Sequence, residues 1–303
     1  MAIMINNRMI STVVTSSIMG HSGGGMFPLT LTPAYNRLRR VIRETNTTNL
    51  TKSSTHPEYS ENFRPFYPWT WRYVQRLGAD GLLNAYGLTN NGVKANAAAI
   101  ASAQSRSFNV IPSFYPQFIK GRAEAINDTL FACGVYNNFL EDFWALEINF
   151  SCPNSREKIR ENMKEGVALV KAVKQAFPRL CLIAKISFVH PYKFAQKLVD
   201  AGVDVIHAIN TIPYGLIYPD TGCASPLAHV GGGGVSGSPI RDKAITYNQG
   251  LRKVLKSRLI MGGGIMSVDD AARFIDIDAD VISLCTVARL NPEEAEKIIC
   301  RYN

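Results

Sequence analysis

The stretch ALEINFSCPN, Ala145–Asn154, indicates how the rest of the chain folds. Its first six residues have the short apolar pattern of a buried strand. Pro153 cannot donate a ladder hydrogen bond, so the strand is expected to end at this turn. The thiol of Cys152 is therefore carried at a strand terminus, where parallel α/β proteins place their chemistry. The alternative interpretation is a small core residue, which is the commoner role of a free cysteine.

Composition indicates a globular, soluble protein and not a disordered or fibrous one. The chain has 303 residues, of which 46% are hydrophobic. Its six cysteines are scattered and form no CxxC pair, which argues against a zinc ribbon or a redox dithiol and favours reduced thiols. We find neither a signal peptide nor an apolar run of about 18 residues. A cytoplasmic location without membrane contact is therefore expected.

The net charge of +9 suits either an anionic surface or small anionic ligands. The basic residues are spread over predicted helix faces, and no block of five or more like charges occurs. Solvated helix faces are therefore the favoured interpretation, and nucleic-acid binding is not expected.

Strand and helix patterns alternate eight times along the chain. The predicted strands are Ile10–Ser16, Leu50–Ser53, Asn109–Phe114, Ala145–Phe150, Leu182–Ser187, Val203–Asn210, Arg258–Met261 and Val281–Thr286. Helical spacing is found over 33–44, 93–103, 121–139, 156–177, 191–201, 241–255, 268–274 and 292–300. Two segments between them, Gly81–Asn91 and the glycine-rich 231–237, are expected to be turns or loop. Because no linker divides the chain, the pattern predicts one domain, residues 1–303, with the α/β fold of a (β/α)8 TIM barrel.

Polar residues gather at the predicted carboxyl ends of the strands, the catalytic face of such a barrel. They are Lys52, Cys152, Asn154, Lys185, Asn210 and Thr211. A lysine in an apolar strand, as at Lys185, needs a partner or a ligand. Glycines at 262–264 and 233–237, together with Thr286, could cradle a phosphate. No GxGxxG fingerprint follows a strand, so a Rossmann nicotinamide site is not predicted.

The aromatic segment Tyr59–Trp71 holds six aromatic residues and two prolines. Either a lid or partner surface, or a loop packed on the flank of the domain, would explain it.

Several stretches in order resemble dihydroorotate dehydrogenases of class 1. They are TKSST (Thr51–Thr55), LLNAYGLTNNG (Leu82–Gly92), EINFSCPN (Glu147–Asn154), AKIS (Ala184–Ser187), INT (Ile209–Thr211), GGVSGSPI (Gly233–Ile240) and GGGI (Gly262–Ile265). The second and sixth look most like the heteromeric, NAD-linked subclass, whose catalytic subunit pairs with an FAD and iron–sulfur subunit.

The resemblance implies oxidation of dihydroorotate to orotate in pyrimidine biosynthesis, with FMN as cofactor. Cys152 matches the base that removes the C5 proton while hydride leaves C6 for the flavin. The implied substrate-binding residues are Lys52, Asn84, Tyr86, Gly87, Leu88, Asn149, Asn154, Asn210 and Thr211. The implied FMN-binding residues are Ser16, Ser17, Lys52, Ser53, Asn149, Lys185, Asn210, Ser236, Gly237, Gly263, Gly264, Cys285 and Thr286.

The chain also departs from the family pattern. Tyr86 stands where relatives carry a smaller apolar residue, and Tyr59–Trp71 replaces a more polar stretch. The loop after Asn154 lacks the usual glycines, and Met261-Gly262 and Cys285 vary the phosphate corner. These differences bear on the substrate and the electron acceptor more than on the fold.

Three other functions are compatible with the motifs. A dihydropyrimidine dehydrogenase domain acting on uracil or thymine would share the cysteine and the asparagines. A tRNA dihydrouridine synthase would suit the basic charge but usually has GCP instead of SCP. A flavin-binding scaffold or partner subunit would bind FMN without turnover. The chain has no cysteine cluster for an iron–sulfur centre and no predicted metal site, so such a centre would come from a partner. We expect a homodimer or a heteromer.

Overall fold

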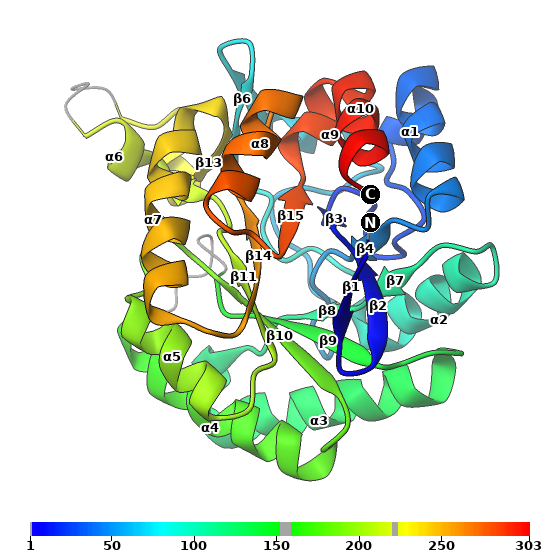
Figure 1. Cartoon of the computed structure of the whole chain (residues 1–303), viewed down its shortest axis with the longest axis vertical. Helices are drawn as coiled ribbons and strands as arrows, with labels where there is room; N and C mark the ends of the chain where they lie inside the picture. The colour runs from blue at the N-terminus through cyan, green and yellow to red at the C-terminus, as the bar shows by residue number, and fades with distance from the viewer. Residues whose placement is uncertain (1, 152–158, 220–223) are drawn as a thin grey trace.

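The computed structural model describes residues 2–151, 159–219 and 224–303. Its main sheet is a closed ring of parallel strands in chain order (Figure 1). The strands are β3 (Val13–Ser16), β4 (Thr48–Leu50), β7 (Val110–Ile111), β8 (Ser113–Phe114), β9 (Ala145–Asn149), β10 (Cys181–Ile186), β11 (Val205–Ala208), β14 (Arg258–Gly262) and β15 (Val281–Leu284). β7 pairs with β4 and β8 with β9, so these two short strands, separated by Pro112, fill one position of the ring. The predicted (β/α)8 barrel is therefore confirmed.

Helices surround the ring and connect successive strands (Figure 1). They are α1 (Pro33–Glu44), α2 (Gly92–Gln104), α3 (Arg122–Phe139), α4 (Ile159–Ala176), α5 (Tyr192–Asp200), α7 (Arg241–Val254), α8 (Val268–Asp276) and α10 (Pro292–Tyr302), with the short α6 (Tyr214–Ile217) and α9 (Thr286–Leu290). α8 begins where the sequence predicts, because the Ser267 hydroxyl accepts a hydrogen bond from the Asp270 N–H. In the part of the chain that the structure describes, no helix is long and apolar enough to cross a membrane.

An amino-terminal hairpin closes one end of the barrel. Strands β1 (Ala2–Ile5) and β2 (Arg8–Ser11) pair antiparallel. Ile5 and Ile10 pack in one buried cluster with residues at the starts of the barrel strands, including Ala145 and Val205. The prediction of one strand over Ile10–Ser16 was wrong, because the chain leaves the hairpin at Ser11 and enters the barrel only at Val13.

A second sheet covers the opposite end. Its antiparallel order is β12 (Ile212–Pro213), β13 (Gly234–Gly237), β6 (Gly81–Asn84) and β5 (Val74–Leu77). The interpretation of Gly81–Asn91 and 231–237 as turns and loop was therefore wrong over 81–84 and 234–237. The glycines of β6 and β13 remove the strand signal from the sequence, because glycine is depleted in strands. Glycine occurs within a strand where another backbone approaches closely. A Cβ at Gly237 would lie 2.0 Å from the Asp80 carbonyl oxygen.

The aromatic segment Tyr59–Trp71 lies beside this second sheet and leads into it through the 3-10 helix η2 (Pro68–Tyr73). Phe63 is buried, whereas Phe66 and Trp69 are 76% and 67% exposed. Phe66 stacks on Phe27, with ring centroids 5.0 Å apart. The segment is therefore packed on the domain and also presents large aromatic side chains to solvent.

Candidate active site

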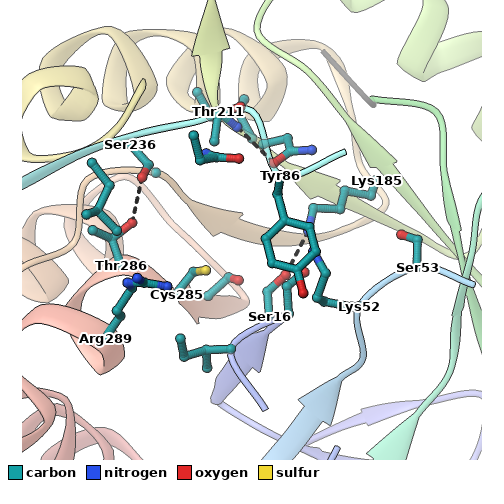
Figure 2. A pocket seen from close by; sticks show the side chains of 18 of the residues that line it. Ser16, Lys52, Ser53, Tyr86, Lys185, Thr211, Ser236, Cys285, Thr286 and Arg289 are labelled. Atoms are coloured by element: carbon teal, nitrogen blue, oxygen red, sulfur yellow. Dashed lines mark hydrogen bonds between the residues drawn. The ribbon is translucent and has the colours of Figure 1, made fainter. Parts of the chain in front are cut away.

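A cavity lies between the carboxyl ends of the barrel strands and the second sheet (Figure 2). All the predicted substrate residues that the structure describes line it: Lys52, Asn84, Tyr86, Gly87, Leu88, Asn149, Asn210 and Thr211. The predicted cofactor residues Ser16, Ser17, Ser53, Lys185, Ser236, Gly263, Gly264, Cys285 and Thr286 line it as well. Gly237 does not line it, and Cys152 and Asn154 lie outside the described residues.

The charge of the cavity is positive. Lys52, Lys185 and Arg289 line it, and no aspartate or glutamate of the described ranges does. Lys185 is 6% exposed, and its ammonium group donates a 2.8 Å hydrogen bond to the Ser16 hydroxyl. This bond joins the ends of β10 and β3 across the barrel. A ligand bearing negative charge is the chemical complement of such a site.

The asparagine side chains are oriented by neighbouring polar groups. Asn149 donates to the Ser53 hydroxyl at 2.9 Å, and its carbonyl oxygen accepts from the Ser151 hydroxyl at 2.7 Å. Asn210 donates to the same hydroxyl at 3.0 Å. Ser151, which we did not single out from the sequence, thus links two of the asparagines predicted to bind the substrate. Since an amide has two donor hydrogens and two acceptor lone pairs, both asparagines keep capacity for a ligand.

The glycine-rich corner of the cavity lies at the ends of β14 and β15. Gly263 and Gly264 have φ of +105° and +89°, a region that side-chain-bearing residues rarely adopt. Beside them, the hydroxyls of Thr286 and Ser236 are 2.9 Å apart. Cys285 is exposed to the cavity, and loss of solvation among the surrounding protein atoms raises the pKa of its thiol despite nearby Lys185, Lys52 and Arg289.

Tyr86 forms one wall of the cavity. The Lys52 ammonium lies 3.4 Å from the centroid of its ring, and Phe63 stacks against it with centroids 4.4 Å apart. The side chain is 9% exposed, and burial raises the pKa of its phenol. An aromatic ring held between a lysine and a phenylalanine restricts the space available to a ligand at Lys52.

Three further side chains form the floor of the cavity. Glu147 in β9 contacts the His207 Nδ1 in β11 at 2.6 Å, and the His207 Nε2 lies 3.0 Å from the Ser283 hydroxyl in β15. His207 and Ser283 line the cavity, and Glu147 lies behind them with no exposed surface. We did not select these residues from the sequence, although a charged or polar residue in an apolar strand is the signal that selected Lys185.

The electrostatic state of this floor follows from its contacts. Burial alone would raise the pKa of Glu147, but Lys185, His207 and hydrogen bonds lower it below its ordinary value. Burial lowers the pKa of His207, and Lys185 lowers it further, against the opposing effect of Glu147. Glu147 is therefore ionised and His207 neutral near pH 7.

Comparison with known proteins identifies the family. The family model for dihydroorotate dehydrogenase matches residues 49–301. The chain is 31% identical over 245 residues to the catalytic subunit of dihydroorotate dehydrogenase B (NAD(+)) of Trichlorobacter lovleyi, covering 76% of this chain and 73% of that protein. It is 26% identical over 223 residues to the protein of that name from Thermotoga maritima, with 72% and 76% covered. It is 29% identical over 227 residues to the protein of that name from Porphyromonas gingivalis, and the match covers 72% of this chain and 70% of that protein. With this match, the parallel barrel and the cavity at its strand ends, the chain belongs to the dihydroorotate dehydrogenase family, a family of oxidoreductases.

Proposed function

We propose that this protein oxidises dihydroorotate to orotate in pyrimidine biosynthesis, with FMN as its cofactor and the whole chain as one catalytic domain. The observation that carries the proposal is the convergence of Lys52, Lys185 and three asparagines on one cavity at the barrel's strand ends. The family of the chain, together with the name shared by its relatives, supports this substrate.

The residues of the cavity fit FMN. Backbone at Gly263 and Gly264 can approach a phosphate closely, and Thr286 and Ser236 offer hydroxyl donors beside it. Lys185, held by Ser16, would stabilise negative charge at the pyrimidine edge of the flavin ring. FMN, when bound, supplies an acceptor for two electrons from a C–H bond.

The chain's own side chains would then orient and deprotonate the substrate. The amides of Asn84, Asn149 and Asn210 match a ring of alternating C=O and N–H groups, and Lys52 matches its carboxylate. Cys152 would remove the proton from C5, which is acidified by the neighbouring carbonyl, while the hydrogen on C6 leaves with two electrons. Such a base contributes about 10²–10⁴-fold to the rate.

A partner is proposed for the onward transfer of electrons. The relatives are catalytic subunits of NAD(+)-linked enzymes, which by that name have a further subunit. We infer that this chain passes electrons to a separate protein, and we propose that this partner carries FAD and an iron–sulfur centre.

One observation favours a second substrate class. Tyr86 stands over Lys52 and narrows the cavity where a substrate carboxylate would contact the lysine. A dihydropyrimidine without a carboxylate, such as dihydrouracil or dihydrothymine, would avoid this constraint. The protein would then catalyse the corresponding oxidation or reduction of that ring.

An anaerobic absorbance spectrum of the purified protein tests these alternatives. Flavin bands that bleach on addition of dihydroorotate support the first proposal, and Cys152→Ser should slow the bleaching by about 10²-fold or more. Bands that bleach only with dihydrouracil or dihydrothymine select the second substrate class. Absence of flavin after reconstitution with FMN contradicts both.

A further inference from the structure

The strands below the cavity carry a relay of three polar side chains that the proposed reaction does not use. Its members are Glu147, His207 and Ser283, contributed by β9, β11 and β15. The two contacts are 2.6 Å from the carboxylate to Nδ1 and 3.0 Å from Nε2 to the hydroxyl. The three side chains are 0%, 1% and 8% exposed, and only the histidine and the serine reach the cavity wall.

The contacts determine which nitrogen carries the proton. An ionised carboxylate only accepts hydrogen bonds, so Nδ1 of His207 donates to Glu147. The Ser113 hydroxyl donates to the other oxygen of the Glu147 carboxylate at 2.8 Å. The carboxylate therefore accepts hydrogen bonds at both oxygens, from Ser113 at one and from His207 at the other. Nε2 of the neutral ring is then unprotonated and accepts a hydrogen bond from the Ser283 hydroxyl.

Protonation of His207 would reverse the last hydrogen bond. With a proton on Nε2, the ring donates a hydrogen bond to the Ser283 oxygen. The serine hydroxyl then no longer donates to the ring, and its own hydrogen points toward the cavity. The cavity floor then presents a hydrogen-bond donor beneath the ligand and a new positive charge behind it. Both changes favour a ligand that has gained negative charge.

We propose that Glu147, His207 and Ser283 form a proton relay that takes up one proton from solvent, onto His207 Nε2, when the cofactor in this cavity receives two electrons. The inference rests on the proposed function for the identity of that cofactor. Transfer of two electrons with one proton adds one negative charge to the ligand, and the proton on His207 restores the charge balance. The substrate supplies both electrons, and solvent supplies the additional proton.

The surroundings of His207 make it the group that responds. Lys185 on the neighbouring strand β10 is its register partner, and β14 places the apolar Ile260 on its other side. Glu147 is the acidic group in contact with it. Negative charge arriving beside Lys185 removes part of the repulsion between Lys185 and a protonated His207, while Glu147 continues to stabilise the imidazolium.

The arrangement resembles the acid–histidine–serine sets of hydrolases, but its backbone differs. Ser283 lies inside β15, whose residues pair with Gly262 of β14 and Val14 of β3. The strand's N–H groups are committed to the sheet, so Ser283 has no adjacent oxyanion hole of the type that acyl transfer requires. Uptake of a proton by His207 beside a bound ligand, with Ser283 changing from donor to acceptor toward the ring, is therefore the chemistry that fits.

The test counts protons taken up on reduction of the FMN-loaded protein, from the pH dependence of its midpoint potential between about pH 6 and 8. We expect about two protons per two electrons in the wild type and about one in His207→Gln and Glu147→Gln. Glu147→Gln keeps a hydrogen-bond acceptor but removes the charge. His190→Gln is the matched control, because His190 is 3% exposed but does not line the cavity.

A second readout needs no variant. Nuclear magnetic resonance of ¹⁵N-labelled histidine should report a neutral His207 with the proton on Nδ1 in the oxidised protein, and an imidazolium after reduction with dithionite. An unchanged neutral ring, or equal proton counts in wild type and His207→Gln, overturns the relay while leaving the cofactor assignment intact. Failure to bind FMN overturns the relay together with the proposed function. Because dithionite supplies the electrons in this test, its outcome does not depend on which substrate the protein oxidises.

Discussion

Among single residues, Lys185 connects the fold to the proposed chemistry most directly. Its ammonium group is nearly buried and contacts the Ser16 hydroxyl at the end of another strand. Burial of a charge is unfavourable unless the charge is paired or meets a ligand. Ser16 carries no charge, and the interaction of Glu147 with Lys185 is a coulombic attraction. The lysine is therefore placed to bind an anion.

The first prediction concerns this lysine. Lys185→Met should weaken FMN binding by about 10- to 100-fold, because a hydrogen bond to a charged group contributes about 1.5–3 kcal/mol. Quenching of FMN fluorescence on titration with apoprotein measures the affinity. Lys253→Met, at an exposed position of α7, is the control. Equal FMN affinity in both variants would show that Lys185 does not contact the cofactor.

Tyr86 gives the second prediction at this scale. Tyr86→Leu removes the ring that the Lys52 ammonium contacts at 3.4 Å, whereas Tyr86→Phe retains it. A cation–π contact contributes about 0.5–2 kcal/mol, so we expect orotate affinity to change by about 2- to 30-fold in the leucine variant and little in the phenylalanine variant. The perturbation of the flavin spectrum by orotate measures this affinity. Equal changes in orotate affinity in the two variants would assign the effect to the phenolic hydroxyl instead of the aromatic ring.

At the scale of elements, the cavity depends on turns that end barrel strands. Gly264 follows β14 in the left-handed region, with φ of +89°. A Cβ there would lie 2.6 Å from the Arg241 Cα at the start of α7. The close approach of this turn to α7 therefore requires glycine, independently of any ligand.

We expect Gly264→Ala to lower the free energy of unfolding by about 1–3 kcal/mol, since a strained backbone conformation costs about this much. Gly215→Ala is the matched control, because a Cβ at Gly215 meets nothing within 4 Å. Urea denaturation of both variants provides the comparison. A Gly264→Ala protein as stable as the control would mean that α7 moves to accommodate the side chain.

For the whole molecule, buried histidines link stability to pH. Burial is the main cause that lowers the pKa of His21 to about 3 and that of His190 to about 4, from an ordinary value of 6.5. Below pH 6.5 the unfolded chain binds protons at these positions and the folded protein does not. Because the unfolded state binds more protons, the free energy of unfolding falls as pH falls.

The measurement is urea denaturation between pH 4 and 8. We expect stability to be lost progressively below about pH 6.5, by up to about 1.4 kcal/mol per pH unit for each such histidine, in one cooperative transition for the proposed single domain. His190→Asn should reduce the slope, because it removes one of the groups. A pH-independent free energy over this range would contradict the linkage, and two separate transitions would contradict the single domain.

The sequence by itself determined the barrel and most of the residues that line its cavity. Apolar runs alternating with amphipathic helices predict a parallel sheet covered by helices, and eight such repeats in one domain of this length predict that the sheet closes into a barrel. Lys52, Lys185 and Asn210 were predictable as site residues because they end strands, and the carboxyl ends of parallel strands meet at one face. The roles of Cys152 and Asn154 stay predictions, since both lie outside the described residues.

Only the tertiary structure decided the remaining features. β6 and β13 pair across about 150 residues of chain, as at Asn84 and Gly234, and their glycines give no local strand signal. Glu147, His207 and Ser283 lie on three strands that are not consecutive in the ring, and each alone reads as an isolated polar residue. Their contacts depend on the closure and stagger of the barrel, which depend on all the strands together. Short-range pattern cannot encode such contacts, because the partners are distant in sequence and adjacent only in the folded molecule.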